Sequence, residues 1–94
     1  MVEISWTRTA LKDLREIHNF ISNDSDFYAD RQILRFMERV EILIKFPLLG
    51  RVVPEKEDET IRELIEGNYR IFYKLVSKTQ IHILRIHSSS KQIR

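Results

Sequence analysis

The 94-residue sequence contains no cysteine and has only two glycines and two prolines. Without cysteine the chain can form neither a disulfide framework nor a thiolate metal site, and it offers no thiol nucleophile. The scarcity of glycine and proline leaves no segment with the composition of a flexible linker. These absences predict a single domain over residues 1–94, and the lack of cysteine fits a reducing compartment, the cytoplasm.

A long hydrophobic run is also missing. Charged residues at Glu3, Arg8, Lys12 and Asp13 interrupt the start of the sequence, which therefore resembles neither a signal peptide nor a membrane span. The formal net charge of +2 is too small to indicate nucleic-acid binding unless the cations are clustered. Because no His-x-x-x-His pair, carboxylate cluster or glycine-rich phosphate loop occurs, we expect neither a metal nor another cofactor.

Hydrophobic periodicity in the first part of the sequence predicts a strand and a helix. Residues 2–6 alternate apolar and polar side chains, which is typical of a short strand at or beside the edge of a sheet. Between residues 8 and 22 apolar side chains recur every three or four positions, and Thr7 or Thr9 is the expected N-cap. The polar residues at 22–25 favour a turn into a second helix, so the two helices form a hairpin.

The second helix is expected over residues 26–46, because Pro47 then stops it. After it, Gly50 is expected to turn the chain with a positive φ, and residues 51–54 to form a short extended piece. The predicted apolar stripe of this helix comprises Ala29, Ile33, Phe36, Met37, Val40, Leu43 and Ile44.

Aromatic residues lie on or near both predicted helices. Trp6, Phe20, Phe27 and Tyr28 are most simply core residues. Phe27 and Tyr28, however, fall at the tip of the hairpin, where exposure of their rings would indicate a protein partner.

The second half of the sequence predicts three adjacent antiparallel strands. Residues 60–66 and 69–76 are β-like runs separated by Gly67-Asn68, a signal for a tight hairpin, and residues 80–87 form the last strand. The charged loop at 55–59 is expected in solvent. The predicted fold class is therefore α+β, with an N-terminal strand and a helical hairpin packed on a C-terminal antiparallel sheet.

Cationic side chains recur along these strands. Side chains alternate across a strand, so Arg70 and Lys74 share one face, while Arg62 lies with Leu64. On the last strand, alternation divides the side chains between the two faces of the sheet. One face carries Ile81, Ile83, Arg85 and His87, and the other carries His82, Leu84 and Ile86. We expect the cationic or titratable groups of the three strands to converge on one concave surface: Arg62, Arg70, Lys74, Arg85 and His87.

Two interpretations of this cluster are open. In the first, its members are solvated sheet residues, several of them paired with Glu63 or Glu66. In the second, the arginines bind phosphate, because a guanidinium group offers a fixed fork of donors that stays charged. His87 is then a candidate general acid or base near neutral pH, although a lone histidine at a strand end is more often structural. His18 and His82 are not candidates.

Four motifs resemble those of a known family and together cover almost the whole chain. They comprise Trp6, Ala10, Asp13-Leu14, Ile17 and Ile21; then Pro47, Gly50-Arg51 and Pro54-Glu55; then Arg62-Glu63-Leu64, Tyr69-Arg70-Ile71 and Tyr73; and finally Ile83 with Ile86-His87. This pattern resembles the ParE branch of the RelE/ParE toxin superfamily, the growth-inhibiting halves of type II toxin-antitoxin pairs. The order of the motifs matches the order of the elements predicted above.

The resemblance implies a cytoplasmic toxin of the plasmid-stabilisation type, held in a hetero-oligomer by a cognate antitoxin that wraps its helices and sheet. ParE-like members poison DNA gyrase and have no catalytic site, whereas RelE-like members cleave messenger RNA on the ribosome without a metal. Because both activities share this fold, the fold alone does not choose between them. A third hypothesis is a non-toxic module that only binds an antitoxin-like partner.

Individual residues sharpen the choice. The resemblance to RelE-like nucleases extends to Tyr69-Arg70 and to Arg85, but such nucleases commonly carry a tyrosine near the C-terminus, and here no tyrosine follows His87. If the chain is a nuclease, the implied catalytic residues are His87, Arg70, Arg85 and Arg62, with Glu55 or Glu63 as a second proton carrier.

The missing tyrosine favours the gyrase-directed mode, which needs a complementary surface on the helical hairpin and at the C-terminus. The residues expected to bind the target or the antitoxin are Arg51, Lys74, Lys91, Phe27 and Tyr28. The tail at 88–94 has no regular pattern, and we expect it to be loose or ordered by a partner.

Overall fold

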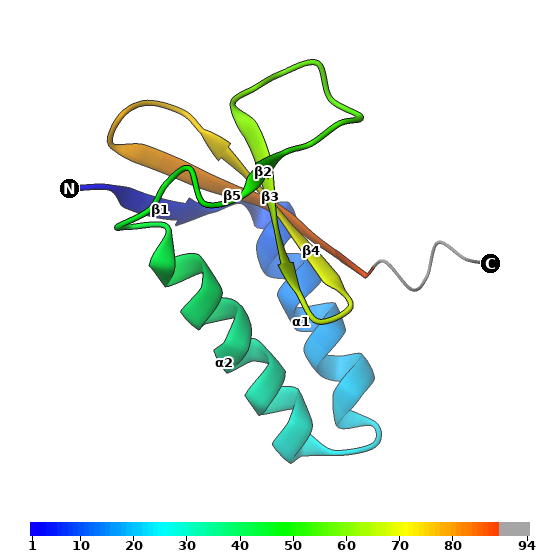
Figure 1. The fold of residues 1–94 in the computed structure, drawn as a ribbon. Coiled ribbons are helices and arrows are strands. Elements are labelled where there is room, and N and C mark those ends of the chain that lie inside the picture. The colour runs from blue at the N-terminus through cyan, green and yellow to red at the C-terminus, as the bar shows by residue number, and fades with distance from the viewer. Residues whose placement is uncertain (89–94) are drawn as a thin grey trace.

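The structure, a computed structural model, describes residues 1–88 of the chain (Figure 1). Its elements follow the predicted order: β1 (Glu3–Trp6), α1 (Arg8–Ser22), α2 (Asp26–Ile42), β2 (Arg51–Val52), β3 (Ile61–Glu66), β4 (Tyr69–Leu75) and β5 (Gln80–Ser88). No helix in this part of the chain is long and apolar enough to cross a membrane.

All five strands form one sheet in the order β1-β5-β4-β3-β2. β1 runs parallel to β5, and the other neighbours are antiparallel. The helical hairpin packs on one face of this sheet, and the turn between α1 and α2 lies away from it (Figure 1). The predicted α+β class, the hairpin and the three adjacent antiparallel strands are therefore confirmed, and β1 is an edge strand as expected.

Local capping sets the beginning of each helix. The side chain of Thr7 accepts the amide of Ala10 at 3.0 Å, which makes Thr7 rather than Thr9 the N-cap of α1. Ser25 does the same for α2 by accepting the amide of Tyr28. Both caps satisfy amides that have no partner within the helix, so the polar turn serves the helix that follows it.

The predicted end of α2 at Phe46 is wrong, because the helix ends at Ile42. The amides of Leu43, Ile44 and Lys45 donate to carbonyls three residues back, and such tight bonds close a helix instead of continuing it. The predicted stripe is correct for the buried residues Ala29, Phe36, Val40 and Leu43 and for the partly buried Ile33, but Met37 and Ile44 are exposed.

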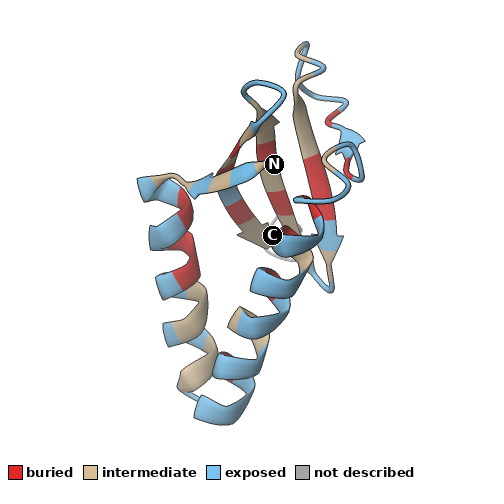
Figure 2. Ribbon diagram, turned by 90° about the vertical axis from the view of Figure 1, so that its left-hand side faces the viewer, coloured by how far each residue is buried: buried red, intermediate tan, exposed pale blue. Residues whose placement is uncertain are grey.

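The core lies between the hairpin and the sheet (Figure 2). Phe36 of α2 and Leu43, the residue that caps its C-terminus, are fully buried, as are Ile71, Tyr73 and Ile83 on the facing side of the sheet. Side chains of this size each stabilise the fold by about 1.5–3 kcal/mol when removed from water. The aromatic prediction holds only for Trp6, which packs against this core.

Phe20, Phe27 and Tyr28 are exposed, so their expected place in the core is wrong. The reason is geometric. Phe20 lies in the last turn of α1, and Phe27 and Tyr28 lie in the first turn of α2, next to the hairpin turn that lies away from the sheet (Figure 1). The alternative expectation for Phe27 and Tyr28, exposure at the hairpin tip, is confirmed. Their rings meet edge to face at 5.3 Å between centroids.

The alternation expected along β5 fails at a β-bulge. The register with β4 shifts between Phe72 and Tyr73, so that Leu84 has no partner of its own. As a result Ile86 is buried in the same core as Ile81 and Ile83, although strict alternation placed it on the opposite side. A single extra residue thus changes the face of every side chain that follows.

The two glycines have different roles. Gly67 begins the β3–β4 turn with φ +58°, a conformation that most other residues adopt only with strain. Gly50 does not have the predicted positive φ. Its role is steric, because a Cβ atom there would lie 2.6 Å from the carbonyl oxygen of Glu63 and 2.7 Å from the ring of Tyr73.

Candidate functional site

The sheet face that points away from the helices carries a buried carboxylate between two arginines. Glu63 is 1% exposed, and its Oε1 accepts Nε of Arg70 at 2.6 Å while Oε2 accepts Nε of Arg51 at 2.5 Å. The hydrogen bond from Arg70 to Glu63 raises the pKa of the Arg70 guanidinium. Arg70 also lies 3.4 Å from the carboxylate of Glu55, so its guanidinium group has two carboxylate partners, Glu63 and Glu55.

Other candidates on this face are less enclosed. Lys74 lies 3.8 Å from Asp58, and both side chains are partly exposed. The pKa of Glu55 is lowered, first by a hydrogen bond from its own backbone amide and, more weakly, by Arg70. A lowered pKa makes Glu55 a weak base at neutral pH, which weakens its expected role as a proton carrier.

Arg62 lies on the opposite, helix-facing side of the sheet, the same side as the core residue Leu64. Its Nη1 donates to the carbonyl of Gly50 at 2.8 Å and to that of Leu48 at 3.4 Å. Beside it, the hydroxyl of Tyr73 donates to the carbonyl of Pro47 and accepts the amide of Gly50, at 2.8 and 2.9 Å. Arg62 and Tyr73 therefore fix the backbone between the second helix and β2.

The side chains of this fixed segment, which we call the 46–50 turn, point largely into solvent. Phe46, Leu48 and Leu49 are all exposed. Arg62 and Tyr73 already form hydrogen bonds with carbonyl and amide groups of the turn. The turn can therefore be buried against a partner at little cost in backbone desolvation. A rigid, apolar surface of this kind fits contact with a protein.

Arg85 lies where β5 becomes the edge of the sheet. β1 pairs with β5 only up to Ile83, and beyond that point side chains of α1 and its cap bind the backbone that β1 leaves unpaired. The hydroxyl of Thr7 donates to the carbonyl of Leu84 at 2.9 Å, and Asp13 accepts the amide of Ile86 at 2.9 Å. Both oxygens of Asp13 also accept nitrogens of Arg85 at 3.2 Å.

A groove of about 520 Å³ follows this edge between α1 and the end of β5. Arg85 and His87 line it, together with Asp13, Glu16 and Tyr69. Nδ1 of His87 lies 3.1 Å from the carbonyl oxygen of Ser88. Two of the predicted catalytic residues thus lie in one groove, and Arg85 is neutralised there by Asp13.

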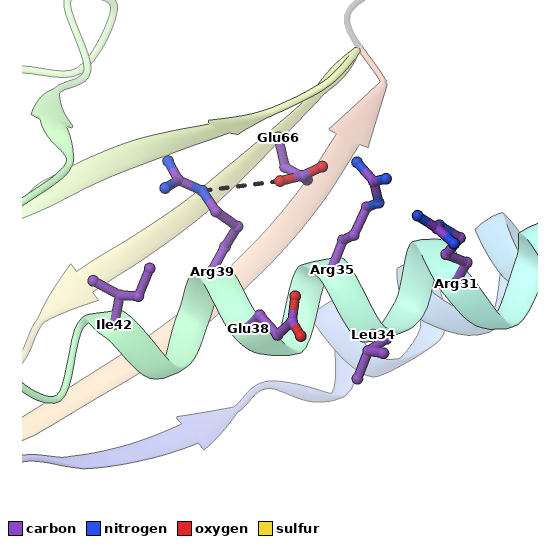
Figure 3. A pocket seen from close by; sticks show the side chains of 7 residues that line it. All are labelled: Arg31, Leu34, Arg35, Glu38, Arg39, Ile42 and Glu66. Carbon is purple, nitrogen blue, oxygen red and sulfur yellow. Dashed lines mark ion pairs between the residues drawn. The ribbon is translucent and has the colours of Figure 1, made fainter.

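A second groove of about 540 Å³ lies between α2 and the end of β3 (Figure 3). Arginines of α2 form one wall, and Nε of Arg39 lies 4.0 Å from Glu66. The full lining is Arg31, Leu34, Arg35, Glu38, Arg39, Ile42 and Glu66.

The expected convergence of five groups on one concave surface is therefore wrong. Arg70 and Lys74 lie on the open face, Arg62 on the helix-facing side, and Arg85 binds α1 at the sheet edge. His87 is the register partner of Arg70 and also lines the α1 groove.

Arg51 is exposed beside Glu63, and Phe27 and Tyr28 are exposed at the hairpin tip. The remaining predicted contact residue, Lys91, lies outside the described residues, as does most of the tail at 88–94.

Asp13, Tyr73 and the α2 arginines were missed as functional candidates. Asp13 carried a detectable signal, since it is an acid within the apolar periodicity of the first helix, next to Leu14. Within residues 1–88, no group of three or more histidines and acidic residues is placed to hold a metal ion.

Comparison with known proteins decides the family. Residues 4–93 match the family model described as the ParE toxin of the type II toxin-antitoxin system parDE. The chain belongs to this family. It is a toxin of a type II toxin-antitoxin system, with the RelE/ParE-like fold.

Individual relatives agree with this membership. The chain is 30% identical over 91 residues to toxin RelE2 of Caulobacter vibrioides, covering 97% of this chain and 99% of that protein. Among solved structures, it resembles the chromosomal ParDE system of P. aeruginosa with a TM-score of 0.75 and 26% identity, over 94% and 96% of the two chains. The RelBE2 toxin-antitoxin complex of Mycobacterium tuberculosis shares the fold, with a TM-score of 0.70, 22% identity, and 93% and 96% coverage.

A chain with this fold has thus been solved in a toxin-antitoxin complex. The relatives carry both ParE and RelE names, and both groups share this fold. Membership of the family therefore leaves the molecular target to be argued from the residues.

Proposed function

We propose that this toxin arrests growth by binding a protein target, DNA gyrase, in the cytoplasm, and that a cognate antitoxin neutralises it in a hetero-complex. The observation that carries the proposal is the pairing of its cations. Arg70 is held by Glu63 and Glu55, Arg85 by Asp13, and Arg51 by Glu63.

Paired cations are poorly suited to phosphodiester cleavage. The transition state of that reaction gains negative charge, which a nuclease stabilises with preorganised positive groups. A carboxylate within hydrogen-bond distance of each guanidinium cancels much of that field and repels a phosphate. Arg62 contributes nothing to such a site, because backbone carbonyls on the other side of the sheet engage it.

The exposed side chains of the 46–50 turn support a protein target. Leu48 and Leu49 together with Phe46 offer apolar contact area on a backbone already fixed by Arg62 and Tyr73. Apolar side chains on a preorganised segment lose little conformational entropy on binding, which favours tight contact with a protein.

One observation favours the alternative, ribosome-dependent cleavage of messenger RNA. Arg70 and His87 are partners in the β4–β5 register, so a cation and a proton carrier lie on neighbouring strands. The alternative assigns His87 the transfer of a proton and Arg70 the stabilisation of the phosphate. It requires Arg70 to leave Glu63 when RNA binds.

The deciding experiment expresses the chain in bacteria and maps gyrase-linked DNA breaks and RNA ends in the same cells. We expect DNA breaks without codon-biased RNA cleavage. Cleavage that His87→Ala or Arg70→Ala abolishes would overturn the proposal in favour of the nuclease, and no growth effect at all would leave only an antitoxin-binding module.

A matched pair of substitutions tests the role of the 46–50 turn. Leu49 and Leu11 are each 48% exposed, but Leu11 lies on α1 outside the turn. We expect Leu49→Ser to reduce both growth arrest and DNA breaks, while Leu11→Ser leaves both unchanged at equal protein abundance. Equal effects of the two substitutions would exclude the turn as the target-binding surface.

A further inference from the structure

Glu63 is a fully buried acid on the sheet face that points away from the helices, which we call the open face. Its side chain has no exposed surface, whereas that of Arg51 beside it is 67% exposed. Each of its two oxygens accepts the Nε of a different arginine, Arg51 on one side and Arg70 on the other. One carboxylate therefore occupies two guanidinium groups at once.

The strand register explains how Glu63 comes to lie between these arginines. Arg51 is its direct partner on β2, and Phe72 is its direct partner on β4. Arg70 precedes Phe72 by two residues and so lies on the same face of β4. Its guanidinium group stacks over the Phe72 ring at 4.8 Å, and this stacking supports the side chain in the position from which it reaches Glu63.

Stability alone does not account for an acid at this position. Removing a carboxylate from water is costly, and the attraction of its cationic partners offsets that cost only when the geometry is very good. Replacing a whole buried ion-pair group by apolar residues of similar volume is often neutral or stabilising. Where such groups have a demonstrated role, they select one arrangement over its alternatives. The buried charge of Glu63 thus points to a selective role.

The arrangement that Glu63 prevents is a pair of unoccupied guanidinium groups on the open face. Among residues 1–88, Arg51 has no other carboxylate within ion-pair distance, and without Glu63 the only such partner of Arg70 would be the exposed Glu55. Two guanidinium groups that reach one carboxylate from different sides are also placed to hold the oxygens of one phosphate. Lys74 adds a third cation to the same face.

We propose that Glu63 determines the class of target: by occupying Arg51 and Arg70 it excludes the phosphates of RNA from the open face, and loss of its charge converts that face into an RNA-binding surface. A polynucleotide would have to displace both arginines from a carboxylate that would then be buried without partners. A protein target makes no such demand. This role rests on the proposed function, since it explains why a toxin with arginines on its sheet acts on a protein and not on messenger RNA.

The test measures the binding of a short fluorescent single-stranded RNA to the full chain by anisotropy. Glu63→Gln keeps the shape of the side chain and removes its charge. We expect this variant to bind the RNA at least tenfold more tightly than the original chain does, with an affinity that falls as salt rises. Adding Arg51→Gln to Glu63→Gln should remove the gain, because one of the two guanidinium groups is then missing.

A matched control separates the position of Glu63 from net charge. Asp58→Asn also removes one negative charge beside a cation of the open face, because Asp58 lies 3.8 Å from Lys74, but both of these side chains are partly exposed. Asp58→Asn should bind RNA like the original chain. An equal gain in Asp58→Asn and Glu63→Gln would overturn the proposal, as would a folded Glu63→Gln that gains no binding.

A measurement on the original chain needs no variant and decides the question if Glu63→Gln does not fold. The NMR signals of the Nε–H groups of Arg51 and Arg70 should stay unchanged when the RNA is added, because Glu63 keeps both groups occupied. Shifts of these signals on addition of RNA would overturn the proposal. RNA binding by the purified chain does not depend on growth arrest, so a failure here is distinct from a failure of the gyrase experiment.

Discussion

Replacing Tyr73 with phenylalanine removes one hydroxyl group from the centre of the molecule. The ring of Tyr73 is fully buried, and its hydroxyl bridges the carbonyl of Pro47 and the amide of Gly50. Tyr73→Phe keeps the ring and its packing, so the substitution isolates the two hydrogen bonds that hold the 46–50 turn.

The expected loss of stability follows from the groups left behind. A buried donor or acceptor without a partner costs about 1–3 kcal/mol, and here the amide of Gly50 and the partly buried carbonyl of Pro47 each lose one. We therefore expect the free energy of unfolding to fall by about 2–4 kcal/mol. The free energy of unfolding of a typical domain is about 5–15 kcal/mol, so this loss is a large share of it. For most values in that range, however, the variant remains folded.

The same substitution should change the response to alkaline pH. Burial raises the pKa of Tyr73 above its ordinary value of 10. Since the folded state then holds the phenolic proton more tightly than the unfolded state, the resulting stability is fully present below about pH 10 and is lost as pH rises through the folded-state pKa. Tyr73→Phe should remove this part of the decline, while the part that comes from Tyr69, whose pKa burial also raises, should remain.

Urea unfolding followed by circular dichroism at pH 7 to 11 measures both effects. Tyr28→Phe serves as the control, because the side chain of Tyr28 is exposed, and it should change stability by less than about 0.5 kcal/mol. If Tyr73→Phe matched this control at pH 7, or kept the full alkaline decline, the assigned hydrogen bonds and burial would be refuted.

Two further predictions concern backbone positions. Gly50→Ala should destabilise the fold by about 1–3 kcal/mol through overpacking, and Gly50→Asn should destabilise it by more. At Gly67 the order should be reversed: alanine should cost about 1–2 kcal/mol and asparagine less, because asparagine tolerates a positive φ. Urea midpoints that rank the asparagine variant below the alanine variant at Gly67 would contradict this. Asp13→Ala should cost about 2–3 kcal/mol by leaving the amide of Ile86 without its acceptor, and exchange of that amide should accelerate relative to the core amide of Ile71. Unchanged exchange at Ile86 would show that Asp13 does not protect the edge.

Periodicity and turn chemistry predict the elements because each depends on local residues. Alternation and capping are properties of short segments, so the strands, both helices and the Gly67-Asn68 hairpin follow from sequence. The end of α2 does not, because Leu43 and Ile44 continue an apolar pattern that the backbone leaves in order to reach β2. Tertiary packing overrides the local preference there.

The candidate site was harder to predict because it depends on which face of the sheet is covered. Sequence places Arg62 correctly with Leu64, but does not reveal that this side faces the helices. The bulge at Leu84 arises from pairing between two strands and has no glycine to mark it. The pairing of Arg85 with Asp13 joins residues that are 72 positions apart, a separation over which local patterns carry no information.

The parallel pairing of β1 with β5 has a consequence for the synthesis of this toxin. The first strand to leave the ribosome pairs with the last, and Thr7 binds a carbonyl 77 residues later. Until β5 is made, β1 has no strand to pair with and Asp13 lacks its partners Arg85 and Ile86, because such distant contacts need both segments of the chain. A nascent or truncated chain that lacks β5 therefore has an incomplete sheet and an incomplete groove beside α1.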